Sequence, residues 1–138
     1  MTKKTEYFVG ENRGNPYAFA HAAINDGADL VIASGPHVLR GMEFYRGHLI
    51  DYSLGDFNNY DAFSSSGDLD ISAILHVTLS DTGSFVSARF TSVVLRTHGQ
   101  AFVDRTQASA RFVNQLSRDD FGAAAALISA NGAVRPLN

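Results

Sequence analysis

Hydrophobic and polar positions change their period along this chain, and the first regular stretch has the spacing of a helix. Asn15 can accept a hydrogen bond from a free amide at a helix start, and Pro16 is tolerated in a first helical turn. Gly27 favours a helix end. The pattern therefore predicts a helix over 16–26, with an apolar face made of Phe19, Ala20, Ala23 and Ile24.

The middle of the chain has the patterns of strands. The continuous apolar run "ADLVIAS", directly after the helix, predicts a strand buried on both faces of a mixed or parallel sheet. Two strands joined at Arg46-Gly47 predict a hairpin in "GMEFYRGHLIDYSL". A longer hairpin follows, with its turn at Asp81-Thr82-Gly83 and a period of two residues in "ISAILHVTLS".

The C-terminal third predicts two helices. Thr106 can begin a helix that runs to about Leu116, and Ser117 can begin another that ends at Gly132. The expected class is α+β (mixed α/β), with a mostly antiparallel sheet of about five strands and helices at both chain ends. We expect residues 1–138 to form a single domain.

Composition removes several classes of function. The net charge of -3 gives no electrostatic reason to expect nucleic acid or an anionic membrane as a partner. The absence of cysteine excludes disulfides and thiolate zinc sites. The N-terminus lacks the apolar core of a signal peptide, and no run is long enough to cross a membrane. On this evidence alone the chain is expected to be cytoplasmic.

One short motif, "SGPHV", carries the strongest chemical signal. It follows an apolar strand at its C-terminal end, where α/β sheets commonly bind ligands. Gly35 would let the backbone approach a ligand, and Pro36 would stiffen the turn that directs His37. Asp56 follows Gly55 at another strand end, which suits a ligand or a general base. The alternative is that His37 is a hydrogen-bonded turn residue and Asp56 caps a turn.

Other titratable residues are given structural roles. We expect His21 to pack within its helix and His76 to be exposed on its strand. Four carboxylates are expected to be loop and turn residues that bind backbone amides: Asp51, Asp61, Asp68 and Asp70. No GxSxG, P-loop or GxGxxG pattern is present, so serine-hydrolase, NTPase and dinucleotide functions have no support.

From Glu11 to Phe57 the chain resembles the CapA-like proteins of bacterial poly-γ-glutamate capsule synthesis. The resemblance lies in "DGADLV", "PHVLRGMEFYRGHLI" and "YSLGDF". That family is similar to the calcineurin-like metallophosphatases, so the expected fold is the C-terminal half of a metallophosphatase-like sandwich. The sequence departs from the family at "ASGPHV", where a neighbouring histidine is usual, and at Asp56, where asparagine is usual.

The resemblance implies a site for a divalent metal, namely Mn, Zn or Fe. It suggests His37 as a metal ligand, Asp56 as a catalytic residue, and four residues that bind substrate: Ser34, Gly35, Arg40 and Glu11. Arg40 could instead pair with Glu43. In that family, segments with "GD"-type, "NNH"-type and histidine-glycine motifs lie ahead of the region that this sequence resembles and supply most of the probable ligands, so we expect those segments to be missing here. Whether this chain binds a metal or is an enzyme is therefore left open.

Two functional hypotheses follow from these observations. In the first, the chain is a metallophosphatase-fold fragment related to capsule biosynthesis that lacks independent catalytic activity. In the second, it is a binding or assembly module that forms a homodimer or pairs with a separately encoded N-terminal half to make an active hydrolase. An exposed strand edge at "ADLVIAS" would favour the second. The family typically works outside the cytoplasm or at the membrane.

Overall fold

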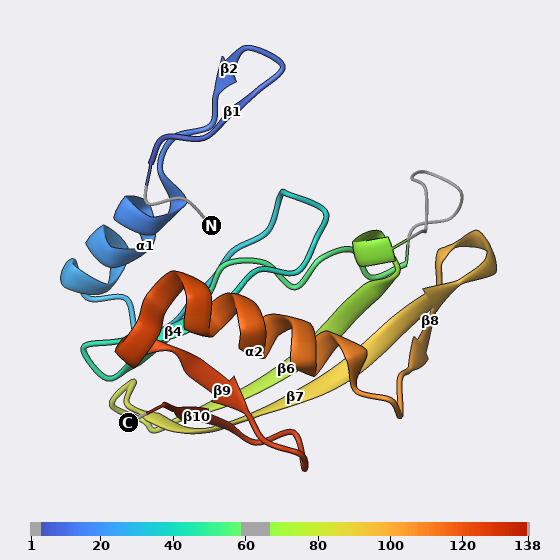
Figure 1. Ribbon diagram of the computed structural model, residues 1–138. Helices are drawn as coiled ribbons and strands as arrows, with labels where there is room; N and C mark the ends of the chain where they lie inside the picture. The colour runs from blue at the N-terminus through green and yellow to red at the C-terminus, as the bar shows by residue number, and fades with distance from the viewer. Residues whose placement is uncertain (1–3, 59–66, 138) are drawn as a thin grey trace.

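The computed structural model describes residues 4–58 and 67–137 (Figure 1). It contains two α-helices, α1 (Pro16–Asn25) and α2 (Ala108–Phe121), within those residues. The strands are β1 (Tyr7–Phe8), β2 (Glu11–Asn12), β3 (Val31–Ile32), β4 (Met42–Tyr45), β5 (His48–Asp51), β6 (Ile71–Leu79), β7 (Phe85–Arg96), β8 (Gln100–Val103), β9 (Ala126–Ile128) and β10 (Val134–Pro136). Three short 3-10 turns complete the order: η1 (Gly67–Leu69), η2 (Thr97–Gly99) and η3 (Gly122–Ala124).

The strands form small sheets, and the class α+β is confirmed. One three-stranded sheet has the order β3-β5-β4, in which β3 pairs with β5 in parallel and β4 pairs with β5 in antiparallel fashion. The other has the order β6-β7-β8 and is antiparallel throughout. The strands β1-β2 and β9-β10 make two-stranded ribbons. The expected sheet of about five strands is thus divided between two three-stranded sheets.

Both predicted hairpins are present. Arg46 and Gly47 have φ values of 53° and 85°, which is the turn that matches the twist of β4 and β5. The longer hairpin pairs β6 with β7 from Ile71↔Val94 to Leu79↔Phe85. Burial along β6 only partly follows the predicted alternation, because Ser72 is buried beside Ala73, whereas His76 is exposed as expected.

The predicted first helix is confirmed as α1. Asn15 accepts a hydrogen bond from the Ala18 amide at 3.0 Å, and Pro16 occupies the first turn. Ala20 and Ile24 are buried, but Phe19, which was assigned to the same face, is 72% exposed. The apolar face is therefore narrower than the spacing predicts.

The strand predicted at "ADLVIAS" is much shorter than expected. Only Val31 and Ile32 form β3, and Ile32 is 46% exposed, so this strand is not buried on both faces. The parallel pairing expected for it is correct, because Val31 lies opposite Ile50 and Ile32 opposite Asp51.

The prediction of two C-terminal helices is wrong. A single helix, α2, continues through Ser117, whose hydroxyl donates to the Val113 carbonyl at 2.8 Å and accepts from the Met42 amide at 2.9 Å. Gly122, with φ of 55°, ends the helix, and the alanine-rich run that follows is divided between η3 and β9. A serine within a helix can bond to a carbonyl four residues earlier, so it does not have to begin a new helix.

The start of α2 also differs from the prediction. The side chain of Asp104, rather than that of Thr106, accepts hydrogen bonds from the amides of Thr106 and Ala108 at 2.8 Å. Gln107 precedes the helix with φ of 57° and contributes no side-chain cap. The capping oxygen therefore lies earlier in the chain than the pattern indicated.

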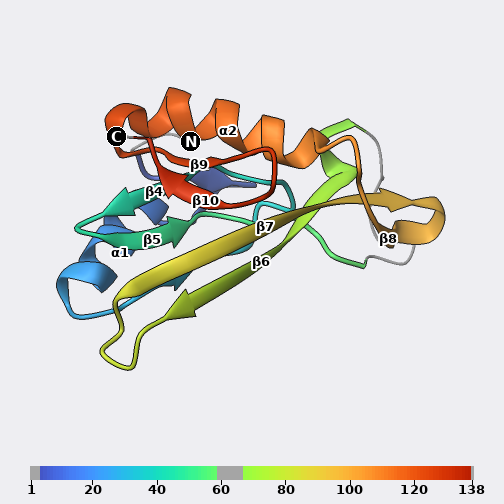
Figure 2. The same ribbon diagram turned by 90° about the horizontal axis from the view of Figure 1, so that it is seen from below.

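Two hydrophobic clusters hold these elements together. In one, α2 and the β9–β10 ribbon lie over the β6–β7 hairpin, with Val113 and Met42 fully buried (Figure 2). In the other, α1 packs on the β3-β5-β4 sheet through Ile24, Val31 and Ile50. Strands β4 and β5 contribute to both clusters, through Met42 and Leu49 in the first and Ile50 in the second.

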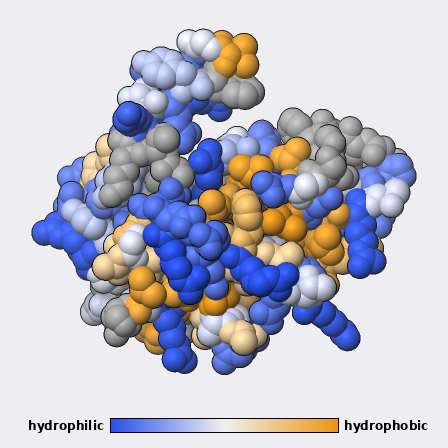
Figure 3. All heavy atoms as spheres, viewed as in Figure 1, coloured by the Kyte–Doolittle hydropathy of each residue, from blue (hydrophilic) through white to orange (hydrophobic). Residues whose placement is uncertain are grey.

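The β1–β2 ribbon projects from the body as an arm (Figure 1). Its tip carries a hydrophobic spot on the surface (Figure 3). In this arm, Tyr7 is 67% and Val9 is 87% exposed. Val9 has φ of 50°, an uncommon conformation for a β-branched residue.

Candidate functional site

The loop after β3 is held against the loop after β5 by backbone bonds. The Ala33 amide donates to the Asp51 carbonyl at 2.9 Å, and the Arg40 amide donates to the Ser53 carbonyl at 3.0 Å. Leu39 in the first loop and Leu54 in the second also pair, as an isolated antiparallel bridge. This pairing brings "SGPHV" beside "LGDF", two segments that the sequence had suggested separately.

His37 and Asp56 meet at this junction. The Nδ1 atom of His37 lies 2.8 Å from Oδ1 of Asp56. The histidine side chain is 48% exposed and the aspartate side chain is 18% exposed, so the pair sits at the surface with its carboxylate partly covered. A carboxylate is the acceptor in such a pair, so Nδ1 carries the proton and the basic lone pair is on Nε2.

Backbone geometry aims the two side chains at each other. His37 has φ of 60° and Gly35 has φ of 135°, so the loop turns sharply on both sides of Pro36. Gly55 has φ of 71°, a left-handed conformation that favours glycine, and the position of an added Cβ would lie 3.4 Å from the Leu39 amide nitrogen. A left-handed histidine is uncommon, and such outliers concentrate at sites with a functional constraint.

The other residues expected at the site are placed differently. Ser34 and Gly35 are exposed on the His37 loop. Arg40 lies 3.8 Å from Glu6, and the alternative pairing with Glu43 is wrong. Glu11 is exposed on the arm in β2. The structure thus brings His37 and Asp56 together, with Ser34 and Gly35 beside them in the loop.

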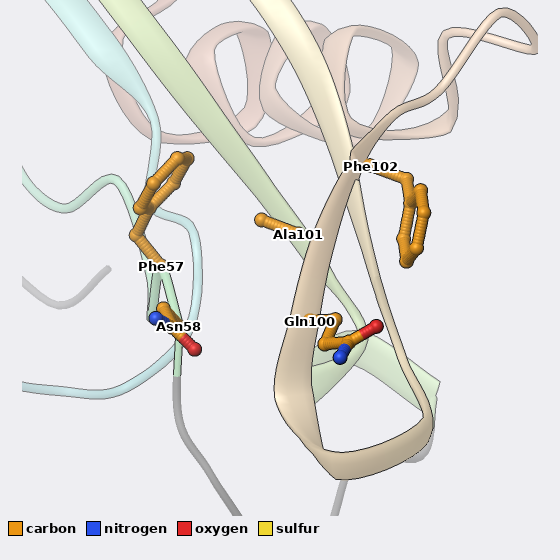
Figure 4. Close-up of a pocket in the computed structure, with 5 residues that line it drawn as sticks. All are labelled: Phe57, Asn58, Gln100, Ala101 and Phe102. Carbon is orange, nitrogen blue, oxygen red and sulfur yellow. The ribbon is translucent and has the colours of Figure 1, made fainter.

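A shallow pocket begins at the residue after Asp56. It has a volume of about 370 Å³ and is lined by Phe57, Asn58, Gln100, Ala101 and Phe102. In Figure 4, Phe57 and Asn58 stand on one side, Ala101 points toward them from β8, and Phe102 points to the opposite side of that strand. An open, partly aromatic surface therefore adjoins the His37–Asp56 pair along the chain.

A second polar cluster, which the sequence did not reveal, joins α1 to the sheet. Oε1 of the buried Glu43 accepts hydrogen bonds from Nε2 of His21 and from the hydroxyl of Tyr52, each at 2.7 Å. The ring of His21 lies between Tyr17 and Tyr45, with centroid distances of 4.0 and 3.7 Å. His21 packs as expected, but as a hydrogen-bond donor to a buried carboxylate.

The signal for this cluster was present in the chain but ambiguous. Glu43 stands between Met42 and Phe44 in an apolar strand, a pattern that suits either an outward or a buried carboxylate. Burial and the neighbouring Glu43 carboxylate raise the pKa of Tyr52. Tyr52 therefore stays protonated and continues to donate to Glu43.

Asp51 corrects another expectation. It was assigned to a turn, but it lies in β5 and is 1% exposed. Within residues 4–58 and 67–137, its Oδ2 atom is buried and has no hydrogen-bond partner. Burial raises the pKa of Asp51 to about 8. The buried Oδ1 of Asp70 also lacks a partner there, and Asp61 lies outside the described residues.

A metal centre does not fit the described residues by themselves. Among them, no three His, Cys, Asp or Glu side chains come together in a way that could hold an ion. A divalent metal needs more ligands than the pair of His37 and Asp56 supplies. In the same part of the chain, no helix has the length and apolar character required to cross a membrane.

The segment that builds this junction is similar in sequence to bacterial capsule synthesis proteins. Residues 11–61 match the family described as bacterial capsule synthesis protein PGA_cap. The resemblance predicted from the sequence is therefore confirmed for this stretch, which contains both His37 and Asp56.

Individual relatives agree with the family match. The chain is 32% identical to the capsule biosynthesis protein CapA of Bacillus anthracis over 78 residues, which cover 55% of this chain and 18% of that protein. It is 50% identical over 40 residues to the uncharacterized proteins y4sH and y4uA of Sinorhizobium fredii, covering 29% of this chain and 9% of each. The chain thus spans less than a fifth of the length of the curated relatives it matches.

Proposed function

We propose that this chain supplies an oriented imidazole, His37 held by Asp56, to a hydrolytic site used in capsule biosynthesis. The observation that carries the proposal is the 2.8 Å bond between these side chains on an exposed loop. Residues beyond the pair complete the site, and the chain has no turnover of its own.

The chemistry assigned to the pair is proton transfer. Asp56 holds the Nδ1 proton of His37, which leaves Nε2 as the basic nitrogen of the ring. A histidine in that tautomer can take a proton from an attacking water and return it to a leaving group. The metal role of His37 that the resemblance implies stays a prediction, because it requires ligands that the described residues do not provide.

The surface beside the pair supports a polymeric or extended substrate. The pocket that starts at Phe57 is open and is lined by two carboxamide side chains, Asn58 and Gln100, together with the Phe57 ring. Such a surface can contact apolar and hydrogen-bonding parts of one chain without enclosing it. Asp56 precedes Phe57 directly, so the pocket begins next to the His37–Asp56 pair in the chain.

A second candidate function, an assembly module, is favoured by one observation. Ile32 is 46% exposed on β3, a strand that pairs with β5 on one edge within the described residues. An apolar residue beside an open strand edge is a surface that another chain can cover. In this proposal the chain forms a homodimer or pairs with a separately encoded N-terminal half.

Hydrolysis of a chromogenic phosphodiester in the presence of Mn²⁺, Zn²⁺ or Fe²⁺ tests the first proposal. We expect the chain and its His37→Ala variant to show the same background rate, and elemental analysis to find less than one metal per chain. Turnover that the His37→Ala substitution abolishes would show instead that the chain is a complete enzyme.

Light scattering at micromolar concentration tests the assembly proposal. A dimer that the exposed-edge substitution Ile32→Lys converts to monomer would support it. A monomeric wild-type chain that binds no apolar dye would contradict it.

A further inference from the structure

A groove lies far from His37 in the sequence, where three segments meet. The edge of β7, the loop between β8 and α2, and the turn between β9 and β10 enclose a volume of about 300 Å³. All three segments lie outside residues 11–61, the stretch that matches the capsule synthesis family. None of the functions discussed above uses this groove.

The groove exists because two neighbours of β7 stop short of each other. The Asp104 amide donates to the Ser92 carbonyl at 2.9 Å, and the Phe90 amide donates to the Gly132 carbonyl at 2.8 Å. Between these bonds, residues 90–92 of β7 line the groove. The side chain of Gln107 donates to the Ala130 carbonyl at 2.8 Å, which ties the two loops together across the groove.

The floor of the groove is apolar. Phe90, Ala110 and Ile128 line it and are 4%, 5% and 6% exposed. These side chains belong to the hydrophobic cluster that contains Val113 and Met42, so the floor is a rigid part of the core. An apolar group can therefore be covered there without movement of the backbone.

The rim of the groove is cationic. Arg89 and Arg105 line it, are exposed, and have no side-chain partner among the residues that the structure describes. Asp104 also lines the groove, but its oxygens accept hydrogen bonds from Thr106 and Ala108. Partial burial alone would raise the pKa of Asp104, and these hydrogen bonds lower it, so the carboxylate is ionised and already bonded.

We propose that this groove binds a small organic anion, a carboxylate or phosphate monoester carried on an apolar body. Two unpaired guanidinium groups match the oxygens of such a head group. The apolar floor takes the body of the ligand, and the carboxamide of Asn131 adds a donor at the rim. The overall charge of -3 makes this positive rim a local feature of the chain.

Amide chemical-shift titration of the intact chain tests the proposal with four probes: phenyl phosphate, benzoate, inorganic phosphate and benzyl alcohol. We expect saturable shifts at residues 90–92, 104–107 and 130–132 with phenyl phosphate and benzoate. The tighter of these two identifies the preferred head group. Arg89→Ala/Arg105→Ala should weaken binding at least tenfold, and Arg135→Ala, an exposed arginine outside the groove, should leave it unchanged.

Four results would overturn the proposal. If neither phenyl phosphate nor benzoate gives saturable shifts, the groove does not bind organic anions. If benzyl alcohol binds as tightly as the anions, or if the double arginine variant binds the anions as tightly as the wild-type protein, the groove does not recognise the negative charge. If inorganic phosphate binds as tightly as phenyl phosphate, the apolar floor does not contribute to binding. Because neither arginine is buried, the double variant is expected to fold, and its unchanged amide spectrum away from the groove verifies this.

Discussion

Nδ1 of His37 and Oδ1 of Asp56 lie 2.8 Å apart although 19 positions of the chain separate the two residues. The contact depends on the parallel pairing of β3 with β5, which places the ends of both strands at the same edge of the sheet. The loop that follows each strand then contributes one member of the pair. The site is therefore a product of sheet topology as much as of the "SGPHV" motif.

Asp56→Asn should allow His37 to adopt both neutral tautomers. The carboxylate fixes the proton on Nδ1, whereas an amide can either donate to or accept from the ring. Long-range ¹H–¹⁵N spectra of the imidazole should show one tautomer in the wild-type protein and a mixture in the variant. Asp68→Asn, at the exposed turn η1, is the matched control. A wild-type ring that already shows a mixture would contradict the pairing in solution.

Asp51→Asn should make stability less dependent on pH. Burial raises the pKa of Asp51 to about 8 in the folded protein from an ordinary value of 3.8. Between these values the unfolded state loses a proton that the folded state keeps, so stability falls as pH rises, by up to about 1.4 kcal/mol per pH unit. Below pH 3.8 and above about pH 8, ionisation of this carboxyl no longer changes the free energy of unfolding with pH.

Urea unfolding of the wild-type protein and Asp51→Asn across that pH range measures the difference. The two curves should diverge steadily as pH rises, with the variant gaining relative stability. Parallel curves would show that Asp51 ionises normally in the folded state.

Glu43→Ala should destabilise the protein strongly. The substitution leaves two donors, His21 and the Tyr52 hydroxyl, without their buried acceptor, at a cost of about 2–4 kcal/mol. Chemical denaturation gives the free energy of unfolding. Glu11→Ala, an exposed position in β2, should change stability by less than about 0.5 kcal/mol. If Glu43→Ala and Glu11→Ala changed the free energy of unfolding equally, the hydrogen bonds to Glu43 would not stabilise the fold.

Gly132→Ala should cost more than its backbone angle alone explains. Gly132 has φ of 84°, and an added Cβ would lie 2.6 Å from the Phe90 carbonyl oxygen. Gly47 has φ of 85° with nothing within 4 Å of the same position, so Gly47→Ala isolates the backbone term. Thermal unfolding should show Gly132→Ala to be less stable than Gly47→Ala by about 1–3 kcal/mol. A smaller loss at Gly132 would mean that the β9–β10 turn moves freely away from β7.

Local signals in the sequence predicted the elements that are governed by local chemistry. Asn15 and Pro16 start α1, and Arg46-Gly47 forms the tight turn, because capping and turn geometry depend on neighbouring residues. His37 and Asp56 could each be identified as candidates from their positions after strands. Their contact required the register of β3 against β5, which the pattern of residues does not specify.

Most errors arose where distant contacts determine structure; the start of α2 is the exception, because Asp104 binds amides two and four residues later. Ser117 looked like a helix start, but its hydroxyl bonds to the amide of Met42, 75 positions away. The run after Gly122 has helix-forming alanines, yet its end, Ala126–Ile128, becomes β9, which pairs with β10 and packs in the same cluster as Val113. Asp51 and Glu43 are polar residues at inward positions, and their burial depends on elements that come later in the chain.

The parallel pairing that creates the His37–Asp56 contact also has a kinetic consequence. Contacts within the matched segment close short loops of 19 to 22 positions, at His37–Asp56 and His21–Glu43, whereas α2 reaches β4 across 75 positions. Short loops lose less entropy on closure, so we expect residues 16–56 to acquire protected amides before α2 docks during refolding. Pulsed hydrogen exchange would show this order, and earlier protection in α2 would reverse it. The candidate site would then assemble first, and the groove at β7 would form only when the last ribbon closes.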